Sequence, residues 1–301
     1  MKDENMTDLD RKRVDAIIRF ALKEDIWSGD VTSGSVLDDD STADAVMLAR
    51  QQGIICGVDI AERVFSSVDE DLKFRPTVSD GDHIEPGQEI AFIEGNATSI
   101  MKGERTALNF MSMLSGVSTN TRRMVDILEG TGVKLYDTRK TIPLHRYLQK
   151  YAVSVGGGFN HRKGLWDMVL IKDNHIRIFA MDHPDIPPEA VAGEIVKRAR
   201  ANVQKNIRIE IEVESLKECR SALEERPDVI MLDNMPPAMI TEAVEMRRAS
   251  GREGQVLFEV SGGITPQNIR SYAIEGVDMI STGSVTGAVH PVNLSLEIIL
   301  K

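Results

Sequence analysis

Six short apolar segments that each end in polar residues constrain the fold of this chain more than any other feature. They begin after residue 130, alternate with stretches of helical periodicity, and have the length of buried strands. The segments are VKLYD (133–137), MVLIKD (168–173), IRIEIEVE (207–214), DVIMLDN (228–234), QVLFEVSGG (255–263) and VDMISTG (277–283). This alternation is typical of βα units in a parallel sheet. No GxGxxG dinucleotide motif accompanies the segments, which favours a barrel-like sheet over a Rossmann sheet.

The N-terminal third of the chain follows a different pattern. Residues 9–23 have apolar side chains at helical spacing, and strand-like segments at 45–49 and 53–56 follow them. Residues 74–95 alternate between apolar and polar around the turn signals DG and PG, which indicates antiparallel hairpins. A second helical pattern begins near Ser99. This part of the chain is therefore expected to combine helices with antiparallel strands.

Composition and charge exclude several classes of protein. The N-terminal residues are charged from the second onward and lack the apolar region of a secretory signal, and no apolar run reaches the roughly 20 residues of a membrane span. Cys56 and Cys219 show no CxxC spacing, so we expect neither a disulfide framework nor a zinc site, and a reducing cytoplasm fits better. A net charge of −11 argues against a nucleic-acid or anionic-membrane surface.

One segment reverses the acidic balance of the chain. Residues 134–177 contain nine Lys or Arg against three Asp. Within this segment Arg139 and Lys140 directly follow a predicted strand, and the triplet His161–Lys163 follows the glycine run 156–158. Guanidinium groups pair bidentately with carboxylate or phosphate, and glycines let the backbone approach a ligand closely. Each cation alone would be explained by a weak surface ion pair. Together, on two strand-end loops, they indicate a site for a small anion.

Acidic side chains end two neighbouring predicted strands. The three glutamates of IEIEVE (209–214) alternate and therefore share one face of their strand. Such a face is usually solvated, but helices cover the outside of a parallel barrel, so these side chains are expected to point into the barrel mouth. Asp233 ends the next strand. One glutamate and one aspartate make a poor zinc site but suit Mg²⁺, which keeps waters and substrate phosphate oxygens as ligands.

Small residues form the loops after the last two predicted strands. These loops are Ser261–Gly263 and Ser281–Ser284, and each precedes a segment of helical character. Exposed N–H groups at such a position bind anions, and paired phosphate loops after the last barrel strands recur in barrel proteins. The sequence SGG alone could be a plain turn, so the prediction of a phosphate site depends on the pair.

Taken together, these motifs resemble those of quinolinate phosphoribosyltransferases. The matching segments are GDVT (29–32), ERTALN (104–109), LSG (114–116), DTRKTIP (137–143), KYAV (150–153), GGGFNHR (156–162), GL (164–165), LIKDNH (170–175), Glu212, LDN (232–234) and SGG (261–263). They span nearly the whole chain in order, and the block 137–175 is highly specific. The resemblance implies an α/β fold, with an N-terminal α/β sandwich followed by an incomplete, open α/β barrel of parallel strands. We expect the sandwich at residues 1–125, which the segment 285–301 could complete, and the catalytic barrel at 126–284.

The resemblance also implies a reaction of NAD biosynthesis. Quinolinate and phosphoribosyl pyrophosphate (PRPP) give nicotinate mononucleotide, pyrophosphate and CO₂ with the help of Mg²⁺. The residues that would bind quinolinate are Thr138, Arg139, His161, Arg162 and Lys172, joined by Arg105 from the other subunit of a homodimer or higher oligomer. Those that would bind PRPP are Lys140, Asp173, His175, Ser261, Gly262, Gly263, Thr282, Gly283 and Ser284. Glu212 and Asp233 would hold the metal and, with Lys140 and Lys172, take part in catalysis.

Two departures from the family pattern and two alternatives stay open. Leu144 and His145 stand where a glycine and an apolar residue are usual, and SVTGA (284–288) replaces the usual apolar-Thr-His-Ser ending. One alternative is a paralogous transferase of the nicotinate-specific or molybdenum-operon type, although a single carboxylate would not need so many cations. The other is a non-catalytic sensor of an anionic metabolite, which would gain nothing from the carboxylates of Glu212 and Asp233.

Overall fold

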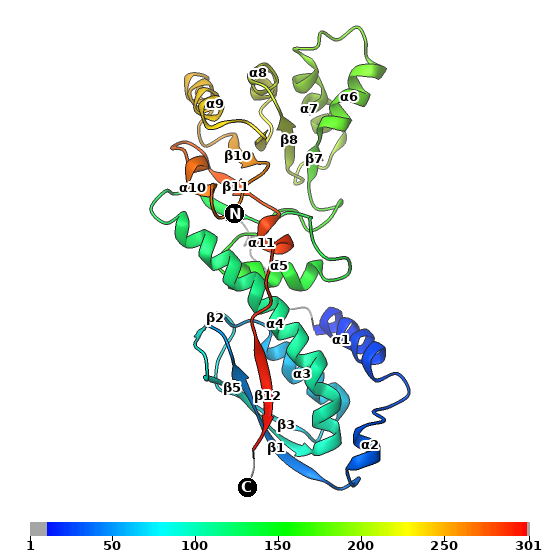
Figure 1. The fold of residues 1–301 in the computed structure, drawn as a ribbon. Coiled ribbons are helices and arrows are strands. Elements are labelled where there is room, and N and C mark those ends of the chain that lie inside the picture. The colour runs from blue at the N-terminus through cyan, green and yellow to red at the C-terminus, as the bar shows by residue number, and fades with distance from the viewer. Residues whose placement is uncertain (1–10, 300–301) are drawn as a thin grey trace. The chain divides into compact units, whose positions relative to one another are not determined.

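The computed structural model describes residues 11–299, which form two compact units (Figure 1). Of the described residues, the first unit comprises those up to Arg122, residues 141–158 and those from Val285 onward, and the second comprises 123–140 and 159–284. The elements are α1 (Arg11–Ile26), α2 (Ser33–Val36), β1 (Thr42–Ala49), β2 (Gly53–Ile54), α3 (Val58–Val68), β3 (Lys73–Pro76), β4 (His83–Ile84), β5 (Glu89–Asn96), α4 (Ala97–Ile127), β6 (Lys134–Tyr136), α5 (Arg146–Val155), β7 (Val169–Ile171), α6 (Asp173–Asp182), α7 (Val191–Asn202), β8 (Ile209–Val213), α8 (Leu216–Glu225), β9 (Val229–Asp233), α9 (Pro237–Ala249), β10 (Leu257–Ser261), α10 (Ile269–Tyr272), β11 (Met279–Ser281), α11 (Ser284–Gly287) and β12 (Leu294–Ile298). Within residues 11–299, none of the helices, α4 included, has both the length and the hydropathy to cross a membrane.

The first unit is built on an antiparallel sheet in the order β12-β1-β5-β3 (Figure 1). Along β1 the buried side chains alternate, with Ala45, Met47 and Ala49 fully or almost fully buried, because successive residues of a strand point to opposite faces. The predicted hairpin region forms β3, β4 and β5. Of these strands, β3 pairs with β5, whereas β4 pairs with β2. The C-terminal strand β12 pairs with β1 and so adds the last segment of the chain to the first sheet.

The segment 141–158 belongs to the first unit, although the sequence analysis assigned it to the barrel domain. Its glycines explain this placement. A side chain at Gly156 would meet the backbone oxygen of Ser118 at 2.6 Å, and one at Gly158 would meet the Thr121 side chain at 2.8 Å. Ser118, on α4, also donates a hydrogen bond to the carbonyl of Ala152 at 2.8 Å. The glycine run therefore allows close approach to a helix, and its role in the approach of a ligand stays a prediction.

The second unit is an open barrel of six parallel strands in the order β6-β11-β10-β9-β8-β7. All six predicted strands are present. Strands β6 and β7 are the two edges, and within residues 11–299 they do not pair, so the barrel is incomplete. The interior contains an apolar cluster of Tyr136, Val229 and Met279 with Phe159 and Leu257 packed against it, and α7 and α8 pack on the outside of β8 and β9. The parallel register sets Ser261 beside Asp233, so the polar strand ends share one edge.

Candidate active site

Asp137, at the end of β6, holds the two cationic loops of the second unit together. Its side chain is fully buried. One carboxylate oxygen accepts a hydrogen bond from the backbone N–H of His161 at 2.7 Å, and the other accepts one from the Asn160 amide at 3.2 Å. A buried carboxylate is costly unless it is hydrogen-bonded, and these donors supply that compensation. Asp137 therefore fixes where the loop 159–162 begins relative to Thr138–Lys140.

Arg139 and Arg162 lie close enough for their charges to interact. Arg162 is only 8% exposed, and one of its guanidinium nitrogens donates to the carbonyl of Met168 at 3.4 Å. Burial, followed by the positive charge of Arg139, lowers the pKa of Arg162. A buried and a half-buried guanidinium group that repel each other form a preorganised site for an anion with two negative groups. The structure thus brings together two of the predicted quinolinate cations.

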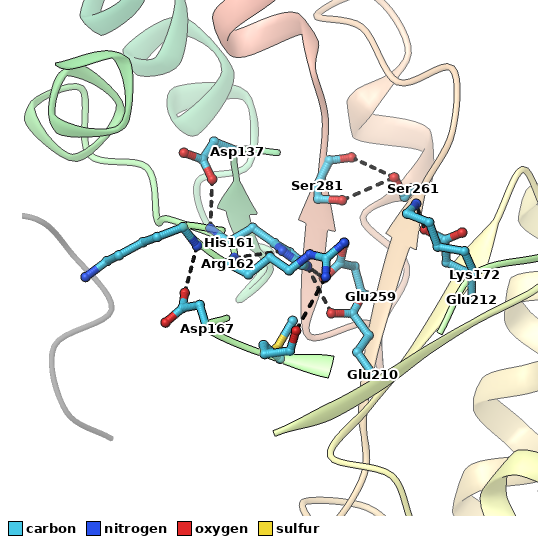
Figure 2. Close-up of polar contacts among 12 residues, drawn as sticks. Asp137, His161, Arg162, Asp167, Lys172, Glu210, Glu212, Glu259, Ser261 and Ser281 are labelled. Atoms are coloured by element: carbon cyan, nitrogen blue, oxygen red, sulfur yellow. Dashed lines mark hydrogen bonds and ion pairs between the residues drawn. The ribbon is translucent and has the colours of Figure 1, made fainter. Parts of the chain in front are cut away.

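The side chain of His161 points into the barrel interior (Figure 2). Its Nε2 lies 3.0 Å from Glu210 Oε2 and 3.4 Å from Glu259 Oε2, and both glutamates are fully buried. Burial lowers the pKa of this imidazole, but the charges of Glu259 and Glu210 raise it well above its ordinary value. Burial and the charge of Glu259 in turn raise the pKa of Glu210 to about 7. The Nε2 atom of His161 is thus close to two carboxylates of the barrel interior, and the role predicted for this residue beside the substrate stays a prediction.

Lys172 and the two predicted metal ligands form an adjacent cluster. Lys172 Nζ donates to Glu212 Oε1 at 2.5 Å, and the lysine side chain is 44% exposed while the glutamate is 12% exposed. Burial and the nearby charge of Glu212 raise the pKa of Asp233, which shows that the two carboxylates lie within electrostatic range. Carboxylates that repel each other in this way suit a divalent cation, which would relieve the repulsion. The residues present therefore fit Mg²⁺.

The two small-residue loops are joined by their own hydrogen bonds. The hydroxyls of Thr282 and Ser284 both donate to the carbonyl of Ile264, at 2.7 and 2.5 Å. Gly262 has φ +100°, and a side chain there would meet Asn234 Oδ1 at 2.2 Å. Only glycine fits such a position, because the positive φ is unfavourable for other residues and the neighbouring strand end leaves no space. The predicted helices contribute less than expected, because α10 begins only at Ile269 and α10 and α11 have four residues each.

Lys140 packs against the last of these loops. A side chain at Gly283 would meet Lys140 Cδ at 2.9 Å and Thr138 Oγ1 at 3.5 Å. Thr138 Oγ1 also accepts a hydrogen bond from the backbone N–H of Lys140 at 3.1 Å. Three residues predicted from different segments, Thr138, Lys140 and Gly283, are therefore neighbours at the ends of β6 and β11.

Three predicted site residues have other contacts in the structure. The His175 ring accepts a hydrogen bond from the backbone N–H of Lys172 at 2.9 Å and caps the start of α6. The Asp173 carboxylate lies 3.6 Å from Arg177 on the exposed face of the same helix. Arg105 belongs to the first unit, on α4, where its side chain is 64% exposed and lies 3.9 Å from Glu104. These contacts are local, and the roles proposed for the three residues in ligand binding stay predictions.

Glu210 and Glu259 were not assigned a role by the sequence reasoning. A signal for both exists, since each is a charged residue between two apolar neighbours inside a strand of a parallel sheet. Fully buried glutamates are rare unless they are paired. The sequence pattern did not distinguish Glu210 from Glu212, because both lie on the same face of one strand. Glu259 was not considered separately from the SGG motif that follows it.

The fold and the site together define a class, namely a parallel-barrel protein whose strand ends bind anionic ligands. Comparison with models of protein families identifies the family within this class. The model described as quinolinate phosphoribosyl transferase, C-terminal domain, matches residues 117–297, and the one described as the N-terminal domain matches residues 30–115. The chain therefore belongs to the quinolinate phosphoribosyltransferase family.

Relatives of known name agree with this assignment. The chain is 40% identical over 287 residues to a probable nicotinate-nucleotide pyrophosphorylase [carboxylating] of Methanocaldococcus jannaschii, covering 94% of this chain and 96% of the relative. A protein of the same name from Bacillus subtilis is 37% identical, with 94% and 93% covered. The solved nicotinate-nucleotide pyrophosphorylase of Francisella tularensis matches with a TM-score of 0.88 and 36% identity over 99% of this chain and 100% of its own.

Proposed function

We propose that the protein transfers the phosphoribosyl group of PRPP to quinolinate and releases pyrophosphate and CO₂, giving nicotinate mononucleotide. The observation that carries the proposal is the pair of interacting guanidinium groups of Arg139 and Arg162, because burial and then the charge of Arg139 lower the pKa of Arg162. A substrate with two adjacent carboxylates would neutralise both groups, whereas nicotinate, with one carboxylate, would leave part of this repulsion in place.

The cation cluster would also hold both substrates in attack geometry. Quinolinate and PRPP are both polyanions and repel each other, so positive charge is needed to bring the ring nitrogen to the ribosyl carbon. Arg139, Arg162 and Lys172 would bind the dicarboxylate. Lys140 and the loops Ser261–Gly263 and Thr282–Ser284 would bind the phosphates, which is supported by the contact between Gly283 and Lys140.

Glu212 and Asp233 would stabilise the transition state of ribosyl transfer. The ribosyl carbon becomes positively charged as the bond to pyrophosphate breaks, and fixed carboxylates nearby offset that charge. The same two residues would hold Mg²⁺, which, when bound, neutralises the pyrophosphate leaving group. Because Lys172 Nζ already contacts Glu212, the lysine also limits how freely this carboxylate can move.

Lys172 would contribute to the decarboxylation step. Loss of the 2-carboxylate leaves a negative charge on the ring carbon, next to the quaternised nitrogen. A lysine fixed at this end of β7 could offset the charge. If Lys172→Ala leaves the rate of CO₂ release unchanged at saturating substrates, this role is excluded.

A homodimer would complete the quinolinate site with Arg105 of the second subunit. The 64% exposure of the Arg105 side chain on its own unit is compatible with a contact across an interface. A reducing cytoplasm remains the proposed location, and both Cys56 and Cys219 are free, buried thiols. Sedimentation of the purified chain would test the dimer. Arg105→Ala should raise the KM for quinolinate without dissociating the dimer.

The decisive experiment measures nicotinate mononucleotide formed from quinolinate, PRPP and Mg²⁺, beside the same assay with nicotinate. Turnover of quinolinate with little or none of nicotinate is the expected result. Turnover of nicotinate alone would identify the paralogous transferase. Binding of quinolinate without turnover would identify the sensor.

A further inference from the structure

Glu210 and Glu259 are two buried carboxylates that the proposed reaction does not use directly. They come from β8 and β10, which β9 separates in the sheet, yet both reach the same imidazole (Figure 2). Carboxylates without exposed surface are costly unless a partner compensates them. The ring of His161 is the partner that they share, so the cluster is a built feature of the barrel interior.

The second nitrogen of the His161 ring defines its tautomer. Nδ1 accepts a hydrogen bond from the backbone N–H of Arg162 at 2.8 Å. A ring nitrogen that accepts a hydrogen bond carries no proton, so the proton of the neutral ring is on Nε2 and faces the two carboxylates. The charges of Glu259 and Glu210 raise the pKa of this ring and so favour a second ring proton. That proton would have to occupy Nδ1 and break the hydrogen bond from the Arg162 N–H, so the proposal requires this hydrogen bond to outweigh the two charges. The hydrogen bond to Arg162 therefore favours the Nε2–H tautomer.

We propose that Glu210 and Glu259 are positioning residues for Arg162. The two carboxylates hold the His161 ring through Nε2–H, and the ring holds the backbone of Arg162 through Nδ1. The guanidinium that follows is thereby kept beside Arg139. The inference rests on the proposed function, because that function places a carboxylate of quinolinate on Arg162.

Substitution of Glu259 tests the proposal by removing one support of the ring. Glu259→Leu has no acceptor for Nε2–H, whereas Glu259→Gln keeps an acceptor oxygen and loses the charge. We expect the KM for quinolinate to rise about 10-fold in Glu259→Leu and clearly less in Glu259→Gln, with the KM for PRPP unchanged. An unchanged KM for quinolinate in Glu259→Leu, or equal rises for both substrates, would overturn the proposal.

A double-mutant cycle separates positioning from a general loss of structure. If Glu259 acts through His161, Glu259→Leu should add almost nothing to the rise in KM that His161→Ala already causes. Independent, additive effects would contradict the proposal. Arg247→Lys is a matched control, because Arg247 is a buried residue of the same unit that pairs with Asp278 on the outside of the sheet. It should lower the melting temperature without a selective change in the KM for quinolinate.

A spectroscopic readout keeps the test independent of turnover. In ¹⁵N-labelled protein, the His161 ring, assigned by its absence in His161→Ala, should show an Nε2–H tautomer in the wild type. Glu259→Gln should shift the Nε2 resonance, and this holds even if Glu259→Leu does not fold. A doubly protonated wild-type ring would contradict the proposed chain of contacts. A stoichiometric metal ion that is bound by the wild type and lost in Glu259→Gln would also contradict it, because His161, Glu210 and Glu259 would then form a metal centre. Absence of quinolinate turnover in the wild type would instead refute the proposed function.

Discussion

The two sheets of this protein bury different kinds of side chain. In the antiparallel sheet of the first unit, the buried face of β1 and β5 is apolar, with Met47 and Ile93 as examples. In the parallel sheet of the second unit, β8 and β10 carry the fully buried Glu210 and Glu259. Apolar burial stabilises a fold without requiring specific partners, whereas buried charge lowers stability unless its partners are held in place. The first sheet is therefore a structural layer, and the second gives up some stability to position a site.

Among substitutions that test this difference between the two sheets, the largest effect is expected on the stability of the first unit. Phe65 is fully buried on α3, and its ring stacks on Phe74 with centroids 5.9 Å apart. Phe65→Ala should lower the free energy of unfolding by about 3 to 5 kcal/mol, because it removes apolar burial and leaves a cavity. Urea denaturation would measure this loss. The exposed Phe20 is the matched control, and Phe20→Ala should change stability by less than about 0.5 kcal/mol. Similar losses for both variants would refute the packing argument.

In the second unit the expected effect falls on substrate binding. Arg162→Ala should reduce kcat/KM for quinolinate by about 10²-fold or more, because it removes a charge-assisted contact in a buried setting. Arg162→Lys keeps the charge but not the bidentate geometry, so an intermediate loss is expected. Steady-state kinetics with each substrate varied would check this. A loss confined to PRPP would mean that Arg162 belongs to the phosphate site.

A substitution in the loop Ser261–Gly263 of the second unit tests whether this loop binds the phosphates of PRPP. Gly262→Ala combines a φ of +100° with a contact of 2.2 Å to Asn234 Oδ1, so the loop must shift. We expect the KM for PRPP to rise by about 10- to 50-fold, the equivalent of roughly 2 kcal/mol of strain and displacement. Gly254→Ala is the control, since Gly254 also has a positive φ of +73° but meets nothing within 4 Å. If both variants bind PRPP equally well, the loop does not contact the phosphates.

A smaller effect concerns the departure from the family pattern in the first unit. Leu144 has φ +67°, a left-handed conformation, and is 89% exposed, so it gains little from packing. Leu144→Gly should raise the free energy of unfolding by up to about 1 kcal/mol, because glycine adopts this conformation without strain. Thermal unfolding would show the increase. A decrease would indicate that the gain in flexibility of the unfolded chain outweighs the strain.

The smallest effect is a pH dependence from His145, which lies half-buried beside the Phe110 ring with centroids 6.1 Å apart. Burial lowers the pKa of His145 below its ordinary value of 6.5. The unfolded state therefore binds the proton more readily, so stability is fully present above about pH 6.5 and is lost as pH falls through the lowered pKa. His145→Leu should reduce this loss by a few tenths of a kcal/mol, discounted for the exposed part of the ring. Urea midpoints of the wild type and of His145→Leu at pH 7.5 and 5.5 would test this prediction. An equal change of midpoint with pH in the two proteins would refute it.

The sequence determined the elements that local patterns encode. The six parallel strands, the polar residues at their ends and the cations at 139–140 and 161–163 all followed from periodicity, charge and glycine placement. These features depend on residues within a few positions of one another, and the side chain of each residue carries the signal directly.

Only the tertiary structure decided which of these residues meet. His161, Glu210 and Glu259 come from three distant segments of the chain and meet in the barrel interior. The glycine run packs on α4, and the segment 141–158 belongs to the first unit. Burial and register set these contacts, because a strand end or helix face is complementary to several others until the whole core is packed. The buried carboxylates of the second unit show this most clearly, since their role depends on a ring nitrogen contributed from far along the chain.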